Sequence, residues 1–145
     1  MVRLLRYFSL LLFALMALTA CDPMAEKTIT IELTNSPNAL DQVKSELEST
    51  LKDLGFAKQD GNSSDHLMVA SYAKIVPNDR GRSTTISVLL YCDARSRKIT
   101  VRIIQAISWS LTDEARSAIE NLEIRLTDSG AVKAIREPKG GGTAY

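Results

Sequence analysis

Two hydrophobic periods follow one another in residues 28–56, which read TITIELTNSPNALDQVKSELESTLKDLGF. In the first six residues Ile29, Ile31 and Leu33 alternate with polar residues, which is the period of a strand with one buried face. Beyond Pro37 apolar residues recur at intervals of three and four, namely Leu40, Val43, Leu47, Leu51 and Leu54. This spacing produces a single apolar stripe. The stretch therefore predicts a strand followed closely by an amphipathic helix.

Short sequence signals mark both ends of this helix. Ser36 fits the N-cap and Pro37 fits the first helical position. Gly55 suits a left-handed residue just past the last turn, and Phe56 can then fold back onto Leu51. We expect a helix that begins near residue 37 and stops at Gly55.

Three further strands are expected after a polar loop over residues 58–65. They span residues 66–76, 84–92 and 98–109, and β-branched residues are frequent in the last two. Turn-forming residues separate these strands. Pro77–Gly81 contains Pro, Asn, Asp and Gly, and residues 93–97 form a short polar connection. We expect these strands to form an antiparallel meander.

A second amphipathic helix is predicted after the meander. It opens with a cap-like segment at Ser110–Asp113 and ends at Gly130, and its apolar stripe comprises Leu111, Ala115, Ala118, Ile119, Leu122 and Leu126. Residues 131–136 fit either a short fifth strand or a tail. The sequence thus predicts an α+β fold, a two-layer sandwich of a four-stranded, mainly antiparallel sheet with two amphipathic helices on one face (order β-α-β-β-β-α). The other sheet face would be open to water or to a partner.

The first 21 residues, MVRLLRYFSLLLFALMALTAC, contain the three parts of a secretory signal. The apolar run from Phe8 to Leu18 is shorter than the roughly 20 residues of a membrane-spanning helix. The ending Leu18-Thr-Ala-Cys21 resembles the bacterial lipobox. This resemblance implies cleavage before Cys21 and attachment of acyl chains (palmitate) to it. The alternatives are an ordinary secreted protein and an uncleaved anchor.

The resemblance implies a division of the chain into four parts. Residues 1–20 are expected to be a signal peptide, 21–27 a lipidated anchor and short tether, 28–136 a single α+β domain and 137–145 a flexible tail. The six-residue tether spans at most about 20 Å, so the domain is expected in the periplasm, close to the bilayer. Asp22 resembles a signal for retention in the inner membrane, and the choice between inner and outer membrane stays open.

Composition argues against several other classes of protein. The chain has 145 residues, of which 45% are hydrophobic and 24% charged, as is usual for a globular protein. Without the signal peptide it carries 16 basic and 17 acidic residues, a balance that argues against a nucleic-acid partner. It has no phosphate-binding or dinucleotide-binding motif. We therefore predict no cofactor, no metal site and no catalytic site.

The predicted domain contains one histidine and one cysteine. His66 could be combined with Asp65 and the neighbouring serines 63 and 64 into a hydrolase triad, but adjacent residues do not easily turn toward one point. A solvated loop is the favoured interpretation. Cys92 is expected to be a small buried residue, with a redox-active or dimer-forming thiol as the alternative.

Several charged side chains are expected to be solvated. The acidic ones lie on the polar side of the first helix, at Asp41, Glu46, Glu48 and Asp53. The basic ones lie in loops at opposite ends of one strand, Arg80 and Arg82 in one loop and Arg95, Arg97 and Lys98 in the other. If one of these two loops faces the bilayer, its basic side chains can contact anionic headgroups.

Large apolar side chains outside the predicted stripes indicate an interaction surface. Trp109 is expected in the core, whereas Tyr91, Leu89 and Ile124 are the candidates for exposure. We expect a non-enzymatic accessory lipoprotein of the cell envelope, held to a membrane by its acyl chains. It would bind an envelope protein through the uncovered sheet face or a strand edge.

Two alternatives for the function belong to different classes. One is an immunity or inhibitor lipoprotein directed against a periplasmic toxin or hydrolase. The other is a binder of a lipid or another amphiphile, which predicts a cavity lined by Leu47, Leu51, Ile119 and Leu122.

Overall fold

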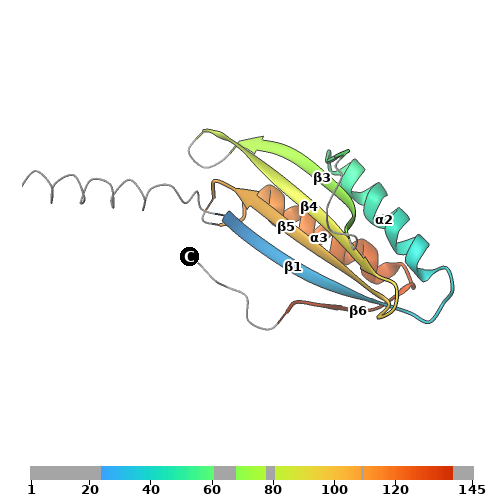
Figure 1. The fold of residues 1–145 in the computed structure, drawn as a ribbon. Coiled ribbons are helices and arrows are strands. Elements are labelled where there is room, and N and C mark those ends of the chain that lie inside the picture. Colours follow the sequence, from blue (N-terminus) through green and yellow to red (C-terminus); the bar gives the residue numbers. More distant parts are fainter. Residues whose placement is uncertain (1–23, 61–67, 78–80, 109, 139–145) are drawn as a thin grey trace, which may run out of the picture.

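The computed structural model describes residues 24–60, 68–77, 81–108 and 110–138. Its elements follow the order strand, helix, four strands, helix, strand (Figure 1). The strands are β1 (Met24–Leu33), β2 (Ala57–Lys58), β3 (Met68–Pro77), β4 (Ser83–Asp93), β5 (Lys98–Ala106) and β6 (Val132–Arg136). The helices are α2 (Ala39–Asp53) and α3 (Asp113–Asp128). The predicted signal peptide, Cys21 and all but two residues of the predicted tail lie outside the described residues.

All six strands form one antiparallel sheet in the order β2-β3-β4-β5-β1-β6. The predicted α+β class is confirmed, but the prediction of four strands is wrong. β2 has two residues, which is too short for an alternating pattern. β6 is the strand that the sequence left open for residues 131–136, and it pairs with the last residues of β1.

β1 begins at Met24, four residues before the predicted start. Residues 24–27 pair in continuous register with residues 103–106 of β5, so this part of the expected tether belongs to the sheet. The sequence did not indicate this early start of β1, because the two residues on the helix side, Ala25 and Lys27, are small or charged. Such residues interrupt the pattern of large buried side chains.

α2 ends as the sequence predicts. Gly55 has a φ of +81°, and the amide of Phe56 donates to the carbonyl oxygen of Leu51 at 2.9 Å. The amide of Gly55 also donates to the carbonyl oxygen of Lys52 at 3.0 Å, which completes a Schellman motif. Lys74 Nζ donates to the carbonyl oxygen of Leu54 at 2.8 Å and so satisfies another carbonyl at this helix end.

The two helix starts differ in how closely they follow the sequence signals. α2 starts at Ala39, with Asn38 at the N-cap and no side-chain cap bond. Pro37 therefore lies in the turn before the helix and not at its first position. The predicted cap of α3 is correct, because the Thr112 hydroxyl accepts a hydrogen bond from the amide of Ala115.

Both helices lie on the same face of the sheet (Figure 1). Between the two layers lies one hydrophobic core, made of alternate strand residues and of the helix stripes. Its fully buried members include Ile29, Ile31, Leu47, Leu51, Ile86, Val88, Ile99, Val101, Ile103 and Leu122. Neither α2 nor α3, the helices of the described part, is long and apolar enough to cross a membrane.

Candidate functional site

The predicted chemical groups do not converge in the described part of the chain. No three His, Cys, Asp or Glu side chains lie together there in a way that could hold a metal ion. Cys92 has a free thiol and is half-buried, so the expectation of a buried cysteine is wrong. Its position in the sheet explains this, because β3 pairs with β4 only as far as Met68 opposite Tyr91, so no described residue of β3 lies beside Cys92. His66, Asp65, the serines 63 and 64, Arg80 and Trp109 lie outside the described residues.

The acidic residues of α2 have separate surroundings. Glu48 forms an ion pair with Lys58 at 3.3 Å, and Asp53 forms one with Arg125 at 2.9 Å. Asp41 is exposed, and Glu46 is half-buried. These ion pairs connect α2 to β2 and to α3 along a solvent-exposed face.

Arg97 differs from the solvated residue that the sequence predicted. Its Nη2 donates to the carbonyl oxygens of Thr34 at 2.5 Å and of Ser36 at 2.7 Å. These oxygens lie in the loop between β1 and α2, so Arg97 fastens the β4–β5 hairpin to that loop. Arg95 and Lys98 are exposed as expected. The two basic loops lie at opposite ends of β4, as predicted.

The sheet face opposite the helices, hereafter the open face, is covered by no described element (Figure 1). Every second strand residue points to it, and the strand register arranges these residues in rows across the sheet. The four central strands contribute Glu26, Thr28, Thr30, Thr100, Arg102, Ile104, Ser87, Leu89, Tyr91, Ser71, Ala73 and Ile75. Hydroxyl and apolar groups thus surround the acid Glu26 and the base Arg102, and three further charged residues, Glu32, Asp93 and Lys98, lie on the same face at the end where β4 meets β5.

That acid and base neutralise each other. Arg102 Nε donates to Glu26 Oε1 at 2.8 Å, and Arg102 Nη2 donates to Glu26 Oε2 at 2.9 Å. The hydroxyl of Thr28 also donates to Glu26 Oε1, at 3.2 Å. These hydrogen bonds, with that from Arg102 the strongest, hold the pKa of the Glu26 carboxyl below its usual range. The Glu26 carboxylate, and to a smaller degree Tyr91, raise the pKa of Arg102, so both partners are charged at neutral pH.

The predicted exposed residues belong to two different surfaces. Tyr91 and Leu89 lie half-buried on the open face, as the alternation of β4 indicated. Ile124 is 62% exposed, but it lies on α3 in the other layer. These three residues therefore do not make one interaction surface.

The sequence pattern did not predict the exposure of two apolar residues on the open face. Ile75 is 73% exposed, and Ile104 is half-buried beside the ion pair. The alternation of inward and outward residues in β3 is interrupted, because the register shifts between Met68 and Ala70. Counting alternate positions from Ala70 instead would have placed Ile75 on the outer face.

Two shallow hollows flank the first turn of α3. One has a volume of about 310 Å³ and is lined by Leu54, Phe56, Lys74, Asp113, Glu114, Ser117 and Ala118. The other has a volume of about 320 Å³ and is lined by Pro77, Ser110, Leu111, Thr112, Asp113, Glu114 and Arg116. The four side chains expected to line an amphiphile cavity, Leu47, Leu51, Ile119 and Leu122, are instead buried members of the core.

No protein-family model matches the chain, and no curated protein is significantly similar to it in sequence. The geometry of the open face is therefore the basis for a proposal about function.

Proposed function

We propose that this protein is a lipid-anchored, non-enzymatic component of the bacterial cell envelope that binds an envelope protein through its open face. The observation that carries the proposal is the one-sided covering of the sheet. The helices leave Tyr91, Leu89 and Ile104 on the face that they do not cover. Aromatic and large aliphatic side chains at the centre of a surface are typical of protein-binding sites.

The charge of the open face supports a protein partner. Two nitrogens of the Arg102 guanidinium, Nε and Nη2, donate to the Glu26 carboxylate. The positive charge of Arg102 is therefore neutralised within the protein. Around this pair the face presents hydroxyl groups from Thr28, Thr30 and Thr100. A neutral surface of apolar and hydroxyl groups suits a protein surface better than a polyanion, which requires uncompensated cations.

The lipobox resemblance at Cys21 supports the location. Attached acyl chains would hold the domain on a membrane, because each buried methylene contributes about 0.8 kcal/mol. A domain held in this way meets envelope proteins at a high effective concentration. A modest binding face is then sufficient for a stable association.

Site-specific photo-crosslinking in the native envelope tests the proposal. A crosslinking amino acid replaces Tyr91 or Leu89 on the open face, and the matched control replaces Ile124, which is exposed on the helix layer. We expect one envelope protein to be recovered from Tyr91 and Leu89 and not from Ile124.

Other outcomes contradict the proposal in distinct ways. Recovery of a secreted toxin or hydrolase supports an immunity or inhibitor lipoprotein. Adducts with lipid alone support the amphiphile binder. Equal recovery from Ile124 and Tyr91 means that the open face is not the binding surface.

A further inference from the structure

The end of the sheet at which β1 begins carries an exposed apolar rim. We propose that this rim, formed by Met24, Ile75 and Ile107, rests on the lipid bilayer. The inference depends on the proposed lipid anchor at Cys21. It adds a second surface, distinct from the protein-binding centre of the open face, and it sets the orientation of the domain.

Strand register brings the three residues to one end of the sheet. Met24 pairs with Ala106, and Ile107 is the next residue along the chain. Ile75 pairs with Thr85 on β4, and the hydroxyl of the preceding Thr84 donates to the carbonyl oxygen of Ala106. Strands lie about 4.8 Å apart, so Met24 and Ile75 lie roughly 14 Å from each other across β5 and β4.

The rim is exposed and uncharged. Met24 is 65% exposed, Ile75 is 73% exposed and Ile107 is 48% exposed. They are three of the five exposed large apolar side chains in the described part of the chain. Between Met24 and Ile75 the row contains Ala106 and Thr85, so contact of this row with lipid removes no charged side chain from water. Arg82, which is exposed next to the first residue of β4 at the same end, can contact anionic headgroups.

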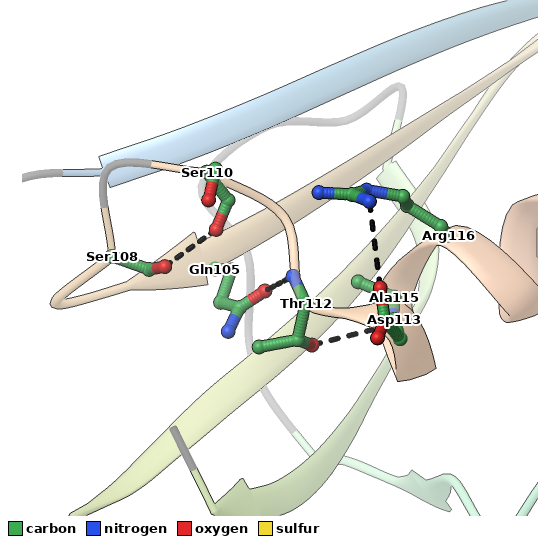
Figure 2. A network of polar contacts seen from close by, with 7 residues as sticks. All are labelled: Gln105, Ser108, Ser110, Thr112, Asp113, Ala115 and Arg116. Carbon is green, nitrogen blue, oxygen red and sulfur yellow. Dashed lines mark hydrogen bonds and ion pairs between the residues drawn. The ribbon is translucent and has the colours of Figure 1, made fainter. Parts of the chain in front are cut away.

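The conformation of Ile107 keeps its side chain at the surface. Its φ is +55°, a value that β-branched residues rarely adopt, so the backbone is strained at this position. The connection between β5 and α3 is held at its α3 end, because Gln105 Oε1 accepts a hydrogen bond from the amide of Thr112 at 2.9 Å (Figure 2). The hydroxyl of Ser108 also donates to the carbonyl oxygen of Ser110 within the same loop (Figure 2).

The start of β1 identifies lipid as the occupant of this rim. Two residues, Asp22 and Pro23, separate Cys21 from Met24, so the Cα atoms of Cys21 and Met24 lie at most about 11 Å apart when this segment is fully extended. The polar zone on each side of a bilayer is itself roughly 5–8 Å thick. A lipidated Cys21 therefore places the first residues of β1 at the headgroups.

Charge decides which layer of the domain touches the bilayer. The first turn of α3 lies at the same end and carries Asp113 and Glu114, together with Arg116. Arg116 is paired with Asp113 at 3.4 Å, so this turn is acidic overall. Anionic headgroups repel it, and contact through the uncharged sheet rim is favoured. The strands then extend away from the membrane surface, and the open face is oriented toward neighbouring proteins in the same membrane.

Depth-dependent fluorescence quenching tests the contact. The full-length protein, extracted from membranes, is reconstituted into phosphatidylethanolamine–phosphatidylglycerol vesicles. In a Cys92→Ala background, Ile107→Cys or Ile75→Cys carries an environment-sensitive fluorophore. Arg95→Cys at the opposite end of the sheet and Ile124→Cys on α3 are the controls, since both positions are exposed.

We expect lipids that carry a quencher near the headgroup to quench the labels at Ile107 and Ile75 at least twofold more than those at Arg95 and Ile124. Vesicle flotation measures the anchor separately. A protein that floats with equal quenching at all four positions retains its anchor, and the rim contact is then wrong. A protein that does not float contradicts both the anchor and the rim contact.

Discussion

Arg102 and Glu26 form a two-pronged ion pair on the open face, with donor–acceptor distances of 2.8 and 2.9 Å. The two residues are diagonal neighbours, because the ladder pairs Arg102 with Thr28 and Glu26 with Ile104. The planar guanidinium thereby bridges adjacent positions of β5 and β1. This geometry couples the stability of the sheet to the charge of one carboxyl group.

Stability is expected to depend on pH through Glu26. Since its pKa is lowered in the folded protein by the Arg102 hydrogen bonds, the stabilisation is complete above the usual glutamate pKa of about 4.3. It is lost as the pH falls through the folded-state value. Both side chains are 39% exposed, so solvent screening limits the effect of Glu26→Gln at pH 7 to about 0.2–1 kcal/mol.

Urea unfolding of the wild type and Glu26→Gln between pH 3 and pH 7 measures this dependence. The difference in free energy of unfolding should shrink toward zero at the acidic end. Glu48→Gln removes a more exposed ion pair and is the matched control, with a smaller effect at pH 7. A difference for Glu26→Gln that is constant with pH contradicts the assignment.

The packing of the two layers predicts a large effect of core truncation. Leu47→Ala and Ile119→Ala should each lower the free energy of unfolding by about 2–5 kcal/mol, because the removed methyl groups leave cavities between helix and sheet. Ile124→Ala, in an exposed position on α3, should change it by less than about 0.5 kcal/mol. Equal effects at Leu47 and Ile124 in denaturant titrations would mean that the helix–sheet contact is assigned incorrectly.

Arg97 is expected to stabilise the domain through backbone carbonyls. Arg97→Ala removes the hydrogen bonds to the carbonyl oxygens of Thr34 and Ser36, and we expect a loss of about 1.5–3 kcal/mol. Arg95→Ala in the same hairpin is the control, since Arg95 is exposed. Thermal unfolding monitored by circular dichroism distinguishes the two variants, and similar midpoints would contradict the structural role of Arg97.

Replacement of the strained Ile107 is expected to stabilise the protein. Asparagine tolerates a positive φ better than a β-branched residue, and the side chain of Ile107 is already half exposed. Ile107→Asn should therefore raise the free energy of unfolding by about 1 kcal/mol while it weakens the proposed bilayer contact. A less stable variant in urea unfolding would show that Ile107 contributes packing that outweighs its backbone strain.

Attachment to the membrane is expected to depend on Cys21 and not on Cys92. Cys21→Ser should move the protein from the membrane pellet to the soluble fraction after cell fractionation, because the lipid attachment site is removed. Cys92→Ser changes the other cysteine, a free thiol at the end of β4, and should leave the protein in the pellet. Retention of Cys21→Ser in the pellet would contradict the lipobox interpretation.

The sequence by itself determined both helices and most of the strand positions. A stripe of period 3.6 and a left-handed glycine such as Gly55 are properties of one local segment. The alternation in β4 likewise placed Tyr91 on the outer face, because the period of a strand is two wherever the strand lies. The apolar rim was not predicted, since its members come from β1, β3 and the loop after β5.

Only the tertiary structure decided the number of strands, the start of β1 and the role of Arg97. β6 is a strand because β1 offers it an unpaired edge, and Met24–Lys27 are extended because β5 continues beside them. Arg97 and its acceptor Thr34 are 63 positions apart. Backbone pairing partners and carbonyl acceptors of this kind are supplied by distant segments, so their positions leave no periodic signal in the local sequence.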